Sequence, residues 1–199
     1  MVDVYTQHAR RFFDQYQTLG FEDVHAEWLQ HLPDHPGFIL DVGAGSGRDA
    51  AAMASRGWDV LAVEPAKGLR ELGEQATQGT RVQWLDDQLP ELDKVRSQAT
   101  RFNLILVSAV WMHLPPSDRE KAFRTLTELL TPGGILVVTL RHGPDDGERI
   151  FYEVDRQELE AWARSHALVG LEAGRDEDKL GRSDVWWETV VFQLKEKRA

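Results

Sequence analysis

Short apolar runs alternate with helical stretches along this chain, and the alternation constrains its fold more than any other feature. The clearest apolar runs cover residues 38–42, 59–63, 81–85 and 102–108. The last of them is almost continuously apolar, as expected of a strand buried on both faces. Strands separated by helices favour a parallel sheet that is covered on both sides. We therefore expect an α/β fold of three layers.

The first 36 residues have a different pattern. Tyr5, Phe12 and Tyr16 recur at roughly helical spacing, and residues 23–31 have the pattern of a second short helix. Proline and glycine at residues 33–37 then end the helical pattern. We expect a helical cap in front of the first strand.

The second half of the chain continues the alternation and then ends differently. Residues 117–120 resemble a capping box that opens a helix, and a fifth strand is expected over residues 135–140. A further helix should begin at Asp155. The last two apolar runs, residues 168–173 and 185–194, follow one another without a helix between them. They predict a hairpin, with one strand antiparallel to the rest of the sheet.

Length, charge and cysteine content narrow the class of protein. The 199 residues suffice for one domain, in which residues 1–36 form the cap and 37–199 the core. A formal net charge of −10 repels phosphate backbones, so a nucleic acid partner is disfavoured. Without cysteine or a clustered set of metal ligands, no metal site is expected. No apolar N-terminal run is present, which predicts no membrane anchor and a cytoplasmic protein.

A glycine-rich turn follows the first predicted strand. Residues 39–50 pass from an apolar run through Gly43, Gly45 and Gly47 into an alanine-rich helix. Such a turn lets backbone N–H groups and a helix N-terminus face a polar ligand. The dinucleotide pattern G-x-G-x-x-G is missed by one position, and no Gly-Lys-Ser/Thr follows as in a phosphate loop. The turn alone is also compatible with simple packing of helix on strand.

Two carboxylates end the next predicted strands. Glu64 lies 21 residues after Gly43, where a carboxylate can accept hydrogen bonds from both hydroxyls of a ribose. Asp86 follows the third strand and could accept from an exocyclic amine such as that of adenine. An adenosine that carries an amino-acid tail suits this set of groups better than a pyrophosphate does.

Five segments in this order and spacing carry a resemblance to a known family. They read LDVGAGSG (40–47), VEP (63–65), DDQLP (86–90), FNLILVS (102–108) and LTPGG (130–134). Over residues 38–140 the sequence resembles the class I S-adenosylmethionine-dependent methyltransferases. The resemblance implies a Rossmann-like, seven-stranded, mostly parallel sheet with an antiparallel final hairpin. It also implies S-adenosylmethionine as the cofactor and methyl transfer as the activity.

The resemblance further implies roles for the residues at matching positions. The loop under the methionine part of the cofactor would comprise Asp41, Gly43, Ala44, Gly45 and Gly47. Glu64, followed by Pro65, would bind the ribose. Asp86, or the backbone of the adjacent Asp87, would face the adenine amine, and Ser108 and Val110 would flank the sulfonium. One departure is Asn103, where many members have Asp; the position starts the strand, away from the site.

His113 and Tyr16 are candidates for the side of the methyl acceptor. His113 follows the fourth strand, where it could accept a proton from an attacking O–H or N–H group. It could equally pack beneath its loop. Tyr16, in the cap, could cover the reacting methyl group or pack on the core as we expect of Phe12.

Arg141 and His142 follow the fifth strand at the same edge of the sheet. Together they could hold the carboxylate or phosphate of an acidic acceptor, with Arg182 as a weaker partner. The alternative is an ordinary surface pair that offsets nearby acidic residues.

The sequence therefore favours methyl transfer from S-adenosylmethionine to a small-molecule acceptor, with an acidic acceptor as one option. Two alternatives remain open: another reaction of the same cofactor, and a non-catalytic protein that binds the cofactor or activates a partner. A nicotinamide-dependent oxidoreductase is disfavoured by the glycine spacing. The sequence makes no prediction about oligomeric state.

Overall fold

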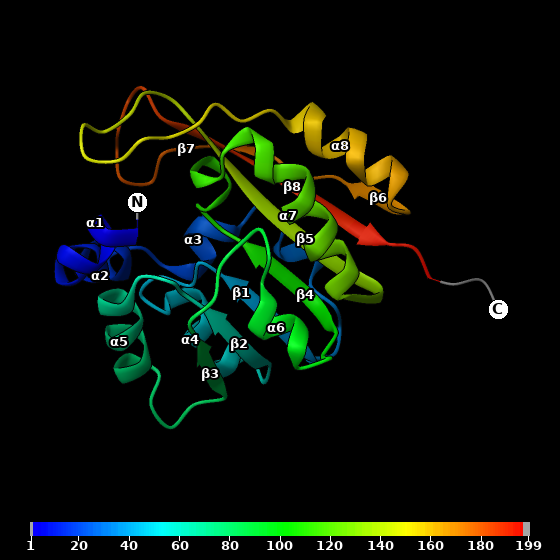
Figure 1. Cartoon of the computed structure of the whole chain (residues 1–199), viewed down its shortest axis with the longest axis horizontal. Helices are drawn as coiled ribbons and strands as arrows, with labels where there is room; N and C mark the ends of the chain where they lie inside the picture. Colours follow the sequence, from blue (N-terminus) through cyan, green and yellow to red (C-terminus); the bar gives the residue numbers. More distant parts are fainter. Residues whose placement is uncertain (1, 197–199) are drawn as a thin grey trace.

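The computed structural model describes residues 2–196, and these form one eight-stranded sheet with helices packed against it (Figure 1). Along the sheet the strands run in the order β3-β2-β1-β4-β5-β8-β6, and β7 pairs with β8 beside this path. The strands are β1 (Phe38–Val42), β2 (Asp59–Val63), β3 (Val82–Leu85), β4 (Phe102–Val107), β5 (Leu130–His142), β6 (Leu168–Leu171), β7 (Arg175–Glu177) and β8 (Trp186–Leu194).

Strand directions confirm the expected mixture. The five strands from β3 to β5 pair in parallel, whereas β8 is antiparallel to β5, β6 and β7. The hairpin and the mostly parallel sheet were predicted correctly. The short strand β7 was not predicted, because Arg175–Glu177 is a charged tripeptide without apolar alternation.

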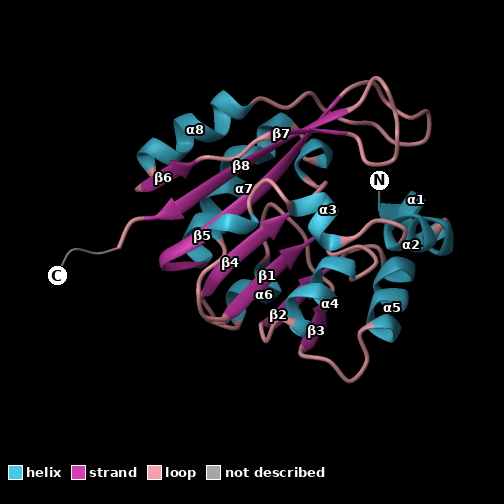
Figure 2. Cartoon of the chain, turned by 180° about the vertical axis from the view of Figure 1, so that it is seen from behind, coloured by secondary structure: helices cyan, strands magenta, loops and turns pink. Residues whose placement is uncertain are grey.

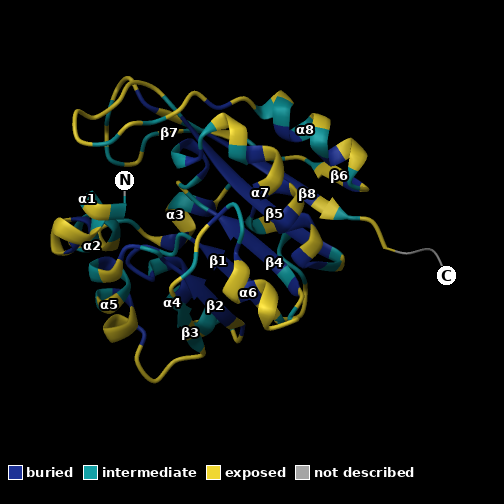
Figure 3. Cartoon of the chain, viewed as in Figure 1, coloured by how far each residue is buried: buried dark blue, intermediate teal, exposed yellow. Residues whose placement is uncertain are grey.

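Helices cover both faces of the sheet (Figure 2). One apolar cluster joins the strands to α6, α7 and α8, and a second joins the opposite face to α3 and α4. Figure 3 shows the strands as the buried centre between these layers. The helices are α1 (Val2–Gln7), α2 (Ala9–Gln17), α3 (Phe21–His25), α4 (Arg48–Ser55), α5 (Lys67–Ala76), α6 (Asp93–Ser97), α7 (Pro116–Leu129) and α8 (Arg156–Ser165).

The N-terminal cap is helical, as expected, but its second part differs from the prediction. Instead of one helix over residues 23–31, α3 ends at His25 and a short 3-10 turn covers Leu29–His31. The break accompanies the full burial of Trp28, whose indole N–H donates to the His25 ring at 2.9 Å. The first two helices pack against α5 through Ala9 and Phe12.

The start of α7 also differs from the prediction. The helix begins at Pro116, and no side chain caps it, so the predicted capping box was wrong. The Ser117 hydroxyl bonds to Asp118 instead of to a backbone N–H group. Proline suits the first helical position, because it has no N–H group to leave unpaired there.

The arrangement of strands places the functional candidates at one edge of the sheet. The carboxyl ends of β1, β2, β4 and β5 meet there because these strands are parallel neighbours, and ligands of open α/β sheets bind at that edge. Every helix among residues 2–196 is too short or too polar to cross a lipid bilayer.

Candidate active site

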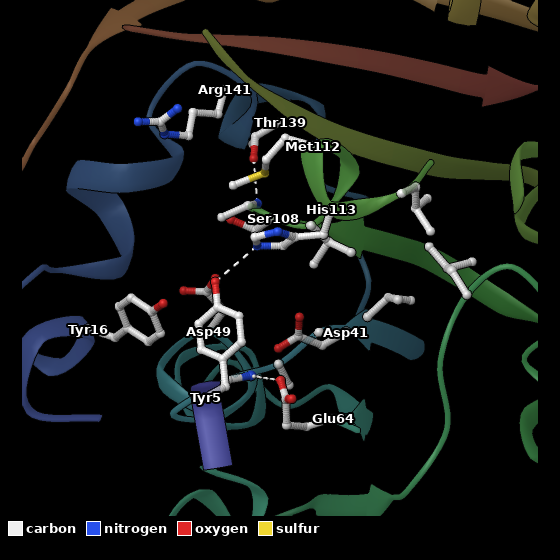
Figure 4. Close-up of a pocket in the computed structure, with 18 of the residues that line it drawn as sticks. Tyr5, Tyr16, Asp41, Asp49, Glu64, Ser108, Met112, His113, Thr139 and Arg141 are labelled. Atoms are coloured by element: carbon white, nitrogen blue, oxygen red, sulfur yellow. Dashed lines mark hydrogen bonds between the residues drawn. The ribbon is translucent and has the colours of Figure 1, made fainter. Parts of the chain in front are cut away.

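A cavity of about 670 Å³ lies at this edge, between the strand ends and the N-terminal cap (Figure 4). Its lining has two parts with different functional groups. We call residues 41–45 with Glu64 the turn end. We call Tyr5, His113, Arg141 and Arg149 the arginine end. Figure 4 shows Glu64 and Arg141 far apart in the view, with Ser108 and His113 between them.

At the turn end, backbone hydrogen bonds hold the glycine turn against β2. The N–H groups of Gly43 and Ala44 both donate to the Val63 carbonyl, at 2.8 and 2.9 Å. Gly43 has a φ of +71°, and a Cβ there would meet Val110 at 2.3 Å. At Gly45, also with positive φ, a Cβ would lie 3.6 Å from the Tyr16 ring. Glycine at these two positions therefore leaves the space above the turn free of side chains.

Gly47 was predicted to belong to the cofactor-binding loop, but in the structure it has a packing role. The residue does not line the cavity, and a Cβ on it would come within 2.8 Å of the Trp84 ring. With a φ of +76° it precedes the first residue of α4. The third glycine is therefore required by packing against β3, and the structure offers no cavity contact at this position.

Glu64 faces the turn from the end of β2. One carboxylate oxygen accepts from Gly45 N–H at 2.9 Å and the other from Ala66 N–H at 2.8 Å. A carboxylate has about four acceptor positions, so two remain for a ligand. Burial raises the pKa of Glu64, and the two backbone hydrogen bonds oppose that rise. Glu64, Pro65 and Ala66 all line the cavity.

The two neighbouring aspartates lie in different places. Asp86 points away from the cavity, and its exposed carboxylate pairs with Arg70 and Lys94. Asp87 does line the cavity, but its carboxylate accepts from the backbone N–H groups of Gln88, Lys94 and Val95 and so caps α6. The predicted adenine contact through the Asp86 side chain therefore has no support in this geometry. Of the two aspartates, Asp87 is the one that lines the cavity.

A buried charged cluster lies beneath the turn, and the sequence did not predict it. Asp49 accepts from the His25 ring at 2.9 Å and from Arg48 at 2.7 Å. Burial opposes ionisation, but His25 and Arg48 hold the pKa of Asp49 below its usual range. Burial and the nearby Asp49 raise the pKa of Asp41 well above its usual value. The Oδ2 atom of Asp41 is buried without a hydrogen-bond partner, which leaves it available to a ligand.

At the arginine end, His113 is hydrogen-bonded to the cap. Its Nε2 atom lies 3.0 Å from the Tyr5 hydroxyl, which also accepts from Arg149 at 2.9 Å. The Nδ1 atom of His113 is buried and has no hydrogen-bond partner among residues 2–196. Burial, with repulsion from Arg149, lowers the pKa of His113 to about 4. His113 is therefore neutral near pH 7 and a poor proton acceptor.

The strand alternation of β5 separates Arg141 from His142. Thr139 and Arg141 line the cavity, whereas His142 stacks on the Trp186 ring with centroids 3.8 Å apart. Arg141 and His142 therefore do not act together on one ligand, which was one of the two options from the sequence, because successive side chains of a strand point to opposite faces. Arg141 lies over the Phe151 ring, 4.1 Å from its centroid.

Tyr16, Ser108 and Val110 line the same cavity as His113 and Arg141, as expected from the sequence. Burial raises the pKa of the Tyr16 hydroxyl, which therefore stays protonated.

Arg149 was missed by the sequence analysis. It contacts Tyr5 and bonds Asp146, two partners that no local pattern connects to a strand end.

Comparison with solved structures identifies the fold. The 1,6-didemethyltoxoflavin-N1-methyltransferase of Burkholderia thailandensis, solved with bound 1,6-didemethyltoxoflavin and S-adenosylhomocysteine, superposes with a TM-score of 0.68 at 20% identity. The match covers 98% of this chain and 88% of that one. A TehB-like methyltransferase from Corynebacterium glutamicum superposes with a TM-score of 0.65 at 20% identity, covering 96% and 99%.

Curated relatives are similar in sequence over part of their length. The ubiquinone biosynthesis O-methyltransferase of Acinetobacter baumannii (strain ACICU) is 31% identical over 109 residues, which are 53% of this chain and 45% of that protein. The protein-L-isoaspartate O-methyltransferase 2 of Rhodopseudomonas palustris (strain HaA2) is 28% identical over 143 residues, covering 71% and 61%. The chain spans about half the length of the first curated relatives that it matches.

A family model described as a methyltransferase domain matches residues 39–134. Together, the matched domain, the curated relatives and the shared fold support assignment to the class I S-adenosylmethionine-dependent methyltransferases. The matched residues include the whole turn end and His113, but they begin after Tyr5 and stop short of Arg141 and Arg149. The arginine end thus lies mostly outside the part that the family model describes.

Proposed function

We propose that this chain transfers a methyl group from S-adenosylmethionine to a small-molecule acceptor. The proposal rests on one observation: the turn end and the arginine end line the same cavity, which has a volume of about 670 Å³. Such a volume is typical of small-molecule sites. The curated relatives are O-methyltransferases, and the Burkholderia structure contains S-adenosylhomocysteine.

The turn end suits the methyl donor. Glu64 has two unused acceptor positions for ribose hydroxyls, and Asp41 has an unpaired buried oxygen. Gly45 keeps the floor free of a side chain between them. The backbone at Asp87 would face the adenine, and Ser108 and Val110 would flank the sulfur. When bound, S-adenosylmethionine supplies a methyl group on a sulfonium, which is already a strong electrophile.

The chain's own contribution to the reaction is then mainly alignment. Holding two reactants in a reactive geometry supplies much of the acceleration of a transfer between them. Tyr16 and Tyr5 cover the cavity from the cap, and the unpartnered Nδ1 atom of His113 can form a hydrogen bond with the acceptor. With a pKa of about 4, His113 orients the acceptor rather than removing its proton near pH 7.

Calorimetry and product analysis test the proposal. The full chain should bind S-adenosylmethionine and S-adenosylhomocysteine at one site per chain, and a turned-over acceptor should release S-adenosylhomocysteine. No binding at millimolar ligand would contradict the proposal. Methylthioadenosine as product would favour another reaction of the cofactor, and binding without any product would favour a non-catalytic protein.

We also propose that the chain works as one domain in the cytoplasm on free small molecules. Its formal net charge of −10 supports a substrate other than a nucleic acid.

A further inference from the structure

Three guanidinium groups gather around the arginine end and the loop before β8. Arg149 is paired with Asp146. Arg182 is paired with Asp178 through two side-chain hydrogen bonds, at 2.9 and 2.6 Å. Arg141 alone forms no ion pair with a carboxylate of residues 2–196, and its terminal nitrogens donate only to backbone carbonyls.

The charge of Arg141 is buried. Its residue is 4% exposed. Burial, with repulsion from Arg182 and Arg149, lowers the pKa of Arg141, but an arginine remains protonated at neutral pH. Arg149 and Arg182 each have a carboxylate partner, in Asp146 and Asp178, whereas Arg141 has none among residues 2–196. A buried charge without a counterion is costly, and a single anion would balance this group.

The free edge of the guanidinium fits one kind of anion. Nη1 donates to the Gly143 carbonyl at 3.2 Å and Nη2 to the Pro144 carbonyl at 2.8 Å. The Nε–H group is buried and has no partner. Nε with the neighbouring Nη forms a planar fork that matches the two oxygens of a carboxylate. The Phe151 ring, 4.1 Å below, holds the plane of the guanidinium in place.

Resting on the methyl transfer proposed above, we infer that the acceptor is a carboxylic acid whose carboxylate binds the Nε edge of Arg141. The one guanidinium of the three without a carboxylate partner matches a monoanion, whereas a phosphate monoester carries more than one negative charge near pH 7. The aromatic side chains of Tyr5, Tyr16 and Phe151 line the same cavity and favour an apolar or aromatic body. Arg141 lies outside residues 39–134, so this preference is a property of the chain rather than of the family match.

Matched acid and amide probes test the inference on the full chain saturated with S-adenosylhomocysteine. The pairs are acetate with acetamide, benzoate with benzamide, and 1-naphthoate with 1-naphthamide, measured by calorimetry or ligand-observed NMR. At least one carboxylate should bind about tenfold or more tightly than its amide, the scale of a charge-assisted bidentate contact. Phenyl phosphate should bind more weakly than benzoate; the opposite order would overturn the assignment to a carboxylate.

Variants of Arg141 test whether this residue, rather than the overall electrostatic potential of the cavity, causes the preference for the acid. Arg141→Gln should abolish the preference for the acid, and Arg141→Lys should keep only part of it, because an ammonium lacks the planar fork. Arg124→Gln, on the exposed face of α7, is the matched control and should behave as wild type. Circular dichroism and the affinity for S-adenosylhomocysteine report whether each variant is folded.

The outcomes distinguish this inference from the proposed function. If wild type does not bind S-adenosylhomocysteine, the proposed function fails. If it does bind but no carboxylate is preferred over its amide, only the carboxylate inference fails. The wild-type comparison holds even if Arg141→Gln does not fold. A folded Arg141→Gln variant that keeps the full preference would also overturn the inference.

Discussion

The turn end of the cavity rests on backbone contacts between neighbouring strands, whereas the arginine end is assembled from side chains far apart in the sequence. Gly45 N–H reaches Glu64, 19 residues away, and the turn bonds the last carbonyl of β2. At the other end Tyr5 bonds His113 across 108 residues and Arg149 across 144. A site built from backbone groups of one turn and the next strand can therefore be recognised in a short stretch of sequence. A site built from side chains of distant segments depends on how the loops and the N-terminal cap pack against one another.

The largest expected effect concerns the packing of Gly47, two residues after the turn end, against β3. Alanine at a left-handed position costs about 1 kcal/mol, and overpacking adds about 1–3 kcal/mol. Gly47→Ala should suffer both, because its Cβ would lie 2.8 Å from Trp84 at a φ of +76°. Gly79→Ala, with a φ of +80° and nothing within 4 Å, should suffer only the first. Urea denaturation should therefore give losses of about 2–4 and about 1 kcal/mol; equal losses would contradict the packing role of Gly47.

A second test asks whether the two ends act separately in ligand binding. Glu64→Ala should weaken S-adenosylhomocysteine binding by about 1.5–3 kcal/mol, because it removes charge-assisted hydrogen bonds to a buried ligand. Arg141→Gln should leave that affinity nearly unchanged. Calorimetry on variants with native circular dichroism measures both. Comparable losses in the two variants would show that the ends are not separable.

The arginine end should also contribute a pH dependence. Its His113 has a pKa of about 4 in the folded protein against 6.5 as the ordinary value. Between these values the unfolded chain binds more protons, so stability falls as the pH falls. From pH 7 to pH 5 this histidine should account for about 2 kcal/mol of the loss. Urea titrations should show that wild type loses about 2 kcal/mol more than His113→Gln between pH 7 and pH 5; identical pH profiles would contradict the burial of a neutral ring.

The smallest effect is expected where the cap meets the loop after β5 on the surface. Arg11 donates to Glu148 at 2.9 Å, but both side chains are exposed. Water and salt screen such a pair, so Arg11→Gln should leave the urea midpoint within measurement error at physiological ionic strength. A clear loss of stability would mean that this ion pair, and not the packing of Ala9 and Phe12 on α5, holds the cap.

Much of the fold could be predicted because buried parallel strands are read directly as apolar runs. The predicted bounds of β1 and β2 match the structure, and β4 ends one residue earlier than expected. The short elements α6 and β7 were missed because their sequences, DKVRS and RDE, are mostly charged and show no apolar pattern. β5 begins earlier than predicted because Leu130 pairs with Phe102 at the start of β4.

The site could be predicted only in part: most residues of the turn end were predicted, whereas some of the arginine end were not. Asp41, Glu64 and the glycines at 43 and 45 lie in or beside a local motif, and all of them line the cavity. The choice between Asp86 and Asp87 stayed open in the sequence, because the direction of a side chain after a strand cannot be inferred from two identical residues; of the two, Asp87 lines the cavity. Arg149 could not be found, because its role requires a loop to meet α1 in space.

A crystal structure with S-adenosylhomocysteine tests the central claim most directly, namely that the turn end holds the donor and the arginine end holds the acceptor. We expect the ribose hydroxyls on the Glu64 carboxylate and the sulfur facing the side of His113. The Arg141 guanidinium should then lie within roughly 12 Å of that sulfur, the space of one small substrate with its hydrogen bonds. A ribose bound away from Glu64, or a sulfur farther than that from Arg141, would contradict the account.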